Sequence, residues 1–198
     1  MGRKRLVVIS GPSGVGKSTL VVRLRSDPRV YWSVSATTRA PRGGERDGVD
    51  YHFLTPEAFE ARVRAEEFLE HAWVHDHRYG TLREPLERAI DRGQVPLLDL
   101  DIQGALVVMD QGLEAFSVFI LPPSFEDLEA RLTARRTETP ERLAKRLENA
   151  RRELAFAPRY DARVVNDDVE RALAELVRLI EEHVGVRLAV GGRAGAAP

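Results

Sequence analysis

Residues 6–18 read Leu-Val-Val-Ile-Ser-Gly-Pro-Ser-Gly-Val-Gly-Lys-Ser, a run of apolar residues followed directly by a glycine-rich turn. The apolar run is typical of a buried β-strand. The turn has the spacing Gly, four residues, Gly-Lys-Ser, and its glycines allow successive backbone N–H groups to surround a phosphate. Lys17 would add a positive charge, Ser18 would offer a hydroxyl to Mg²⁺, and a helix starting here would direct its positive end at the same anion. The stretch therefore predicts a strand, a phosphate-binding loop and a helix; an ordinary Gly-rich turn is the alternative.

The composition limits the classes of function. The chain has 198 residues, with 30 Lys or Arg against 31 Asp or Glu. This length suits one domain, and the balanced charge gives no support to general binding of nucleic acid or membrane surfaces. No cysteine is present, which excludes disulfides and thiolate metal sites and fits a reducing compartment. The apolar run that ends at Ser10 is too short for a secretory signal or a membrane span. We expect a cytoplasmic protein that binds neither nucleic acid nor membranes.

Strand-like and helical patterns alternate along the chain, which predicts an α/β fold with a parallel central sheet and helices on both faces, three layers in all. The C-terminal helix has the clearest apolar stripe and follows a cap at Asp167 or Asp168. Besides the first strand and these two helices, we expect strands at 95–100, 116–121, 162–165 and, weakly, at Val34-Ser35, and helices at 82–92 and 102–110.

Two segments depart from this alternation. Residues 35–87 contain short strand-like pieces around a helical piece, and they are predicted to form a small α+β insertion. Residues 122–156 contain two helices that separate near residues 137–140, the first with a capping box of Ser124 and Asp127, and their spaced arginines suit a helical lid over phosphates. We expect a single domain at 1–188 (core 1–34, 88–121 and 157–188; insertion 35–87; lid 122–156) and a flexible tail at 189–198.

A pair of arginines in the insertion indicates a second phosphate site. Arg39 and Arg42 lie three residues apart around Pro41, and two guanidinium groups can bind a phosphate monoester through paired hydrogen bonds. A solvated basic turn is the alternative. Residues that would complete a nucleotide pocket follow in the same segment, and they favour the phosphate site: Glu45, Tyr51, Glu70, Tyr79 and Thr81.

From about Leu6 to Ile180 the chain resembles the guanylate kinases. The resemblance is carried, in order, by residues 9–19, 33–45, 48–53, 67–70, 79–81, 98–104 and 165–168. It implies a P-loop kinase fold in which the insertion binds GMP. It also implies transfer of the terminal phosphoryl group of ATP to GMP, and by extension to dGMP, in purine nucleotide metabolism and GMP recycling.

The resemblance assigns roles by position. The catalytic residues are Lys17, Arg39, Arg135 and Arg146. ATP is bound by Gly11, Pro12, Ser13, Gly14, Val15, Gly16, Lys17, Ser18, Thr19 and Asn166. GMP is bound by Ser35, Arg39, Arg42, Glu45, Tyr51, Glu70, Tyr79, Thr81 and Asp101. Mg²⁺ is held by Ser18 and, through water, by Asp101. Arg131 and Arg142 are weaker candidates in the lid.

Guanine recognition by Glu70 also has an independent chemical basis. Guanine presents adjacent N1–H and N2–H₂ donors, and one carboxylate can accept from both. Adenine has no such pair and would leave the carboxylate without a partner in a closed pocket.

Several alternatives remain open at this point. Asp101 could be a helix cap, and the lid arginines could be solvated. Arg136, where relatives commonly have Gly, puts the turn geometry in doubt, and Arg78, where they often have an aromatic residue, could adjust GMP affinity. His71, His75 and His77 are close in sequence, but a surface or packing role is favoured over a metal site.

Two other functions are compatible with the fold. One is a non-catalytic peptide-binding module, like the guanylate-kinase-like domains of membrane-associated scaffolds, and the other is a kinase for a different small molecule. The partners expected are GMP and ATP; the oligomeric state is not determined, and a homodimer is compatible with the sequence.

Overall fold

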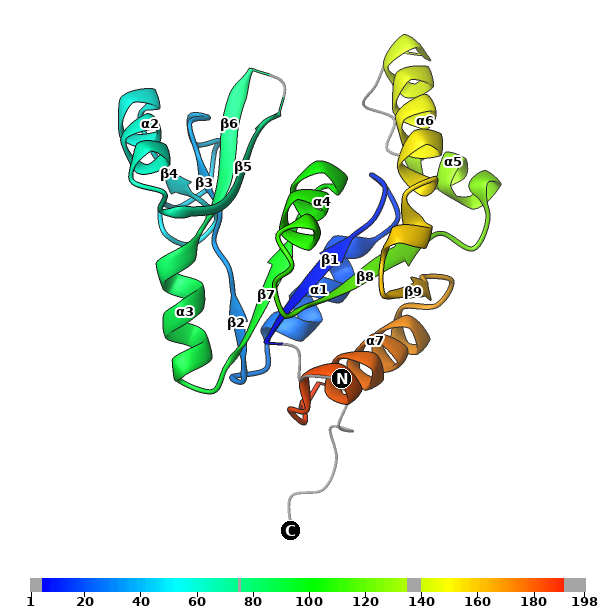
Figure 1. Cartoon of the computed structure of the whole chain (residues 1–198). Helices are drawn as coiled ribbons and strands as arrows, with labels where there is room; N and C mark the ends of the chain where they lie inside the picture. Colours follow the sequence, from blue (N-terminus) through cyan, green and yellow to red (C-terminus); the bar gives the residue numbers. More distant parts are fainter. Residues whose placement is uncertain (1–4, 75, 135–139, 191–198) are drawn as a thin grey trace.

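The computed structural model describes residues 5–74, 76–134 and 140–190. Its central sheet has five parallel strands in the order β2-β7-β1-β8-β9 (Figure 1). All residues of β1, the central strand, are buried, because a strand covered on both faces is apolar along its whole length. The strands are β1 (Leu6–Ser10), β2 (Val30–Trp32), β7 (Val95–Asp99), β8 (Ala115–Leu121) and β9 (Ala162–Val165).

Helices cover both faces of this sheet. On one face, α1 (Lys17–Arg25) and α7 (Val169–Val184) share a core with Val7 and Ile9 of β1. On the other, α3 (Arg83–Asp91) and α4 (Ile102–Asp110) share a core with the alternate residues Leu6 and Val8. Because successive side chains of a strand point to opposite faces, β1 contributes to both apolar cores and so joins the three layers. The predicted three-layer α/β fold with a parallel central sheet is confirmed.

A second sheet lies beside the core and falls within the segment predicted as an insertion. It has the order β4-β3-β6-β5, with β3 and β4 parallel and the other pairs antiparallel. Helix α2 (Pro56–Arg64) covers one face, where Phe59 stacks on Phe68 with 4.4 Å between ring centroids. The strands are β3 (Ala36–Thr37), β4 (His52–Phe53), β5 (Phe68–Val74) and β6 (His77–Leu82).

Two further helices, α5 (Phe125–Thr133) and α6 (Pro140–Leu154), occupy the segment predicted as a lid, and a short 3₁₀ helix, η1 (Ala157–Arg159), follows them. Ser124 caps α5 by accepting a hydrogen bond from the backbone N–H of Asp127 at 3.0 Å, as predicted. The separation of the helices at 135–139 lies outside the described residues. Figure 1 shows α5 and α6 on one side of α4 and the second sheet on the other, both towards the end of the core where β1 and β8 finish.

The structure differs from the sequence prediction at the second strand and at the start of the expected tail. The strand expected at Val34-Ser35 is wrong: β2 ends at Trp32, because it pairs with β7 from Val30 onward at the edge of the sheet, where a strand need not be apolar throughout. Ala189, placed in the flexible tail by the sequence, donates its backbone N–H to Asp27. The rest of the expected tail, from residue 191 onward, lies outside the described residues.

Candidate active site

The phosphate-binding loop connects β1 to α1, and close contacts explain its glycines. Gly11, Gly14 and Gly16 have φ values of 154°, 88° and 89°. A Cβ atom at Gly11 would lie 2.6 Å from the carbonyl oxygen of Ile120, and one at Gly16 would collide with the side-chain amide of Asn166. Gly16 is also the N-cap of α1. The backbone N–H groups of the loop and the positive end of α1 therefore lie together, as an anion site requires.

Lys17 is the first residue of α1, and its ammonium group is held at the end of β7. It forms an ion pair with Asp99 and donates to the carbonyl oxygen of Leu100 at 3.2 Å. Both charged side chains are about one-fifth exposed. The pairing of Asp99 with Lys17 was not predicted from the sequence. Ser18 and Thr19 follow Lys17 and are exposed in the first turn of the helix.

Asn166 lies beneath the phosphate-binding loop. Its buried side chain donates to the carbonyl oxygen of Val15 at 2.8 Å. Arg131 of α5 donates to the same oxygen at 3.2 Å and to the backbone oxygen of Asn166 at 3.0 Å. The structure thus places Asn166, a predicted ATP residue, against the loop, and Arg131 joins α5 to it.

Helix α6 also reaches the loop. Arg146 donates to the hydroxyl of Ser13 at 2.8 Å. The carboxylate of Glu153 accepts a hydrogen bond from the backbone N–H of Ser13, although burial raises the pKa of Glu153 above its ordinary value. Sequence reasoning missed Glu153, because an acid on an amphipathic helix rich in charges has no distinguishing pattern. The predicted catalytic Arg135, and Arg136, lie outside the described residues.

In the second sheet, Arg39 and Glu45 form a paired ion bridge. The two guanidinium nitrogens of Arg39 donate to the two carboxylate oxygens of Glu45 at 3.0 and 2.8 Å, and this pairing raises the pKa of Arg39 and lowers that of Glu45. Arg39 also donates to the hydroxyl of Tyr79 at 3.2 Å. A planar cation held in this way has a defined orientation for a phosphate.

Two more predicted GMP residues join this cluster. The guanidinium carbon of Arg39 lies over the ring of Tyr51, 5.3 Å from its centroid, and the ring centroids of Tyr51 and Tyr79 are 5.9 Å apart. The backbone N–H of Arg42 donates to Glu45 at 2.7 Å, and its side chain is exposed. The structure therefore brings together the residues predicted to bind the phosphate of GMP.

Glu70 is the buried acid of the second sheet. It accepts a hydrogen bond from the hydroxyl of Thr81 at 2.7 Å and is only 6% exposed. Burial is the largest cause that raises the pKa of Glu70 to about 7; the bond from Thr81 opposes this shift and the charge of Asp101 adds to it. A Cβ atom at Gly104 would lie 3.1 Å from a carboxylate oxygen of Glu70, so this acid faces the start of α4. Glu70 and Thr81, two of the residues predicted to bind GMP, are therefore in direct contact.

Residues 99–101 connect the two halves of the site. Asp99 holds Lys17, while Asp101 accepts from the backbone N–H of Gly104 at 2.8 Å and caps α4. The cap left open by the sequence is thus present. Ser35 precedes β3, and its carbonyl oxygen accepts from the backbone N–H of His52 at 2.9 Å. The carboxyl end of β7 and the start of α4 thus contact Lys17 on one side and lie close to Glu70 on the other.

Arg78 does not belong to this site. It pairs with Glu60, contacts His71 at 3.1 Å, and lies over the rings of Phe59 and Trp73. Since neighbouring residues of a strand point to opposite faces, Arg78 faces α2 while Tyr79 faces the pocket. That Arg78 could adjust GMP affinity stays a prediction, and its side chain contacts α2 and β5 rather than the Arg39 cluster. Within the described residues, no three His, Cys, Asp or Glu side chains are grouped to hold a metal ion; His75 lies outside them.

The comparisons with known proteins agree with this arrangement. Residues 3–183 match the family model described as guanylate kinase. Guanylate kinases of Mycolicibacterium paratuberculosis and Bifidobacterium longum are each 50% identical to the chain, over 98% and 92% of its length and 88% and 96% of theirs. The crystal structure of guanylate kinase from Anaplasma phagocytophilum superposes with a TM-score of 0.74 at 33% identity, covering 94% of this chain and 90% of that one. The chain belongs to the guanylate kinase family.

Proposed function

We propose a role for each residue of this site in the reaction of this enzyme. The reaction transfers the terminal phosphoryl group of ATP to GMP and gives ADP and GDP. The observation that carries the assignment is the meeting of two anion sites at one end of β7. A complete phosphate-binding loop with Lys17 lies on one side, and the Arg39 cluster with the buried acid Glu70 lies on the other.

The donor, ATP, binds at the loop. The backbone N–H groups of residues 11–16 and the ammonium of Lys17 bind its phosphates. Arg146, already in contact with Ser13, adds positive charge from α6. Asn166 donates to the loop at Val15, and its match to the family pattern assigns it to the adenine end of the nucleotide. Arg135 has the same role as Arg146 in the proposal, on the strength of its match to the family pattern.

The acceptor, GMP, binds at the second sheet. Arg39, Arg42, Tyr51 and Tyr79 bind its phosphate. The base is read by Glu70, whose carboxylate accepts from the N1–H and N2–H₂ donors of guanine. The remaining base contacts are assigned to Ser35, Thr81 and Asp101.

The chemistry requires alignment and charge rather than a general base. The attacking atom is a phosphate oxygen of GMP, which is already largely anionic because its second pKa is about 6. The main obstacle is repulsion between two anions, and fixed cations in line with the transfer lower it. Lys17, Arg39 and Arg146 supply such cations. Glu45 keeps the guanidinium of Arg39 oriented before the phosphate arrives.

Oxygen ligands suited to Mg²⁺ are available beside the loop. The ion prefers carboxylate, hydroxyl and water oxygens, and both the hydroxyl of Ser18 and the carboxylate of Asp101 are exposed at this edge. These two residues would hold the ion, Asp101 through water. When bound, Mg²⁺ neutralises charge on the phosphates of ATP.

The remaining proposals concern the compartment, the partners and the oligomeric state of the enzyme. Among the described residues, no helix combines the length and the apolar character needed to cross a bilayer. We place the enzyme in the cytoplasm, where it recycles GMP with ATP and binds neither nucleic acid nor membranes. A homodimer is the oligomeric state to test by light scattering.

A coupled assay for ADP release tests the proposal with GMP, dGMP, AMP, dTMP and UMP as acceptors. We expect turnover with GMP and dGMP and little with the other three. A higher kcat/KM for AMP, dTMP or UMP would refute the role of Glu70. Binding of ATP without turnover of any acceptor would point to a non-catalytic module instead.

A further inference from the structure

The strand that carries Glu70 contains a β-bulge. In the pairing of β5 with β6, Phe68 lies opposite Leu82 and Glu70 lies opposite Thr81, so the register skips Leu69. Two steps on β5 thus match one step on β6, which defines a bulge with one extra residue. Bulges of this kind change the direction in which the next side chain points.

Because of the bulge, Phe68 and Glu70 of β5 point to opposite faces of the second sheet. In a regular strand, Phe68 and Glu70 would point to the same side, because they are two residues apart. Here Phe68 stacks on Phe59 under α2, while Glu70 bonds to Thr81 on the opposite, pocket-facing side. Leu69, between them, packs into the core cluster that includes α4. The orientation of Glu70 therefore depends on the bulge staying at Leu69.

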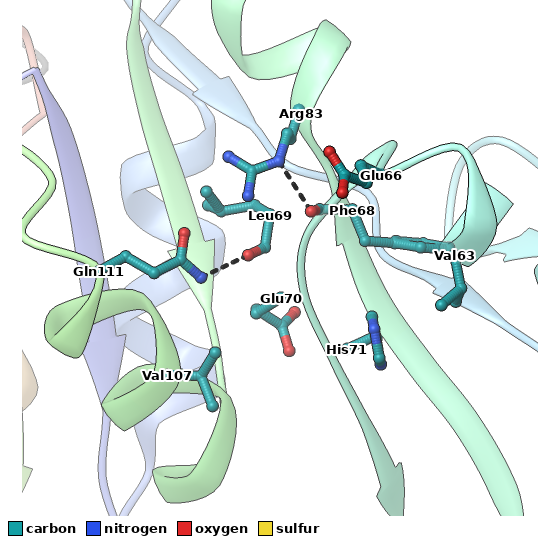
Figure 2. Close-up of a pocket in the computed structure, with 9 residues that line it drawn as sticks. All are labelled: Val63, Glu66, Phe68, Leu69, Glu70, His71, Arg83, Val107 and Gln111. Atoms are coloured by element: carbon teal, nitrogen blue, oxygen red, sulfur yellow. Dashed lines mark hydrogen bonds between the residues drawn. The ribbon is translucent and has the colours of Figure 1, made fainter.

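Two side chains from outside the second sheet hold the bulge. Arg83, the first residue of α3, donates its Nε–H to the carbonyl oxygen of Phe68 at 2.8 Å. Gln111, the C-cap of α4, donates its side-chain amide to the carbonyl oxygen of Leu69 at 2.6 Å. Figure 2 shows the two bonds on consecutive carbonyls of the strand, one from each helix. Both donors come from helices that pack on the central sheet.

A cavity lies at the same place. Its volume is about 670 Å³, and Arg83 and Gln111 line it together with residues 68–71. Figure 2 shows the carboxylate of Glu70 directed into the space between Val107 and His71. Val107 is 43% exposed. β5 is the outermost strand of its sheet and borders this cavity. The residues of the bulge, 68–70, are at most 6% exposed, and the two hydrogen bonds add a directional constraint that packing alone does not supply.

We propose that Gln111 and Arg83 are positioning residues that determine guanine specificity, because they fix the bulge that aims Glu70 at the base. The proposal rests on the assignment of Glu70 as the base-reading residue. In this proposal both residues act through the backbone of β5, which accepts their hydrogen bonds. Gln111, with the shorter bond and a neutral side chain, is the better site for a test.

The test compares Gln111→Met with Gln94→Met. Methionine is similar in length to glutamine and lacks the donor, and Gln94 makes a matched bond, from its amide to the carbonyl oxygen of Pro28 at 3.0 Å, beyond the C-terminal end of α3. The assay measures KM and kcat for GMP, for IMP, which lacks the 2-amino group, and for ATP. Misalignment of a hydrogen bond to a charged group predicts a roughly tenfold rise in KM for GMP in Gln111→Met. The preference for GMP over IMP should fall, and KM for ATP should stay within about twofold of wild type.

Rescue and stability measurements separate positioning from general damage. Gln111→Lys and Arg83→Lys keep a donor and should retain more of the GMP preference than Gln111→Met and Arg83→Met. An unchanged GMP to IMP preference in Gln111→Met would overturn the proposal. So would a joint loss of all kinetic constants with a lower Tm. If the wild-type protein itself showed no preference for GMP over IMP, the assignment of Glu70 would fail first, independently of the variants.

Discussion

Lowering the pH from 8 to 6 tests whether Glu70 reads guanine as a carboxylate. Burial raises the pKa of Glu70 to about 7. An acid with this pKa is roughly nine-tenths ionised at pH 8 and roughly one-tenth ionised at pH 6. Only the ionised form can accept from both guanine donors. KM for GMP should therefore rise about tenfold between pH 8 and pH 6, which matches the fall in the ionised fraction.

The assay is the initial rate of GMP phosphorylation at saturating ATP, at pH 8, 7 and 6. The phosphate of GMP also titrates, with a second pKa of about 6, so the control must share this phosphate but lack the carboxylate. Glu70→Gln meets this need, because it keeps the size and the bond from Thr81. Glu70→Gln should bind GMP more weakly at pH 8, discriminate less against other bases, and show a smaller pH dependence. Parallel pH profiles for the two proteins would refute the reasoning.

Three other changes follow from single contacts. Lys17→Ala should lower kcat by about two to three orders of magnitude, because it removes a cation from the transferring phosphoryl group; near wild-type turnover would contradict the assigned role. Gly16→Ala should abolish ATP binding in a calorimetric titration, since φ is 89° and a Cβ would meet Asn166; normal affinity would show that the loop tolerates the displacement. Asp27 accepts from Arg29 at 2.7 Å, and this bond lowers its pKa to about 2. Its stabilising effect is therefore complete above its ordinary pKa of 3.8 and lost as the pH falls through about 2. Asp27→Asn should lower stability at pH 7 by about 1–2 kcal/mol in urea unfolding, and an equal difference from wild type at pH 2 would contradict this explanation.

Local patterns in the sequence predicted a large part of the fold. The strand before the phosphate-binding loop, the helix at 102–110 and the strand at 162–165 occur with the predicted bounds. Each contains buried apolar residues, as a continuous run in β1 and with the helical period in α4, and such patterns predict the type of element. β6 was not predicted, because its sequence His-Arg-Tyr-Gly-Thr-Leu is mostly polar and its place in a sheet depends on pairing with β5 and β3.

Site residues, like the elements of the fold, were predicted where their pattern is local and missed where it depends on contacts between distant segments. The glycines of the loop, Lys17 and the Arg39 pair could be identified because each belongs to a short motif whose chemistry is local. The ion pair of Lys17 with Asp99 and the bond of Gln111 to the backbone of Leu69 could not, because the partners lie 82 and 42 positions apart. Neither contact leaves a pattern in the local sequence.

The sequence alone therefore determined the phosphate-binding loop, the layered α/β fold and the resemblance to a family, since these depend on periodicity and on motifs of a few consecutive residues. Only the tertiary structure decided which face of β6 holds Arg78, where the bulge in β5 lies and which acid receives Lys17. Those features depend on strand register and on contacts between distant segments, and a shift of one residue in register reverses the face of every side chain.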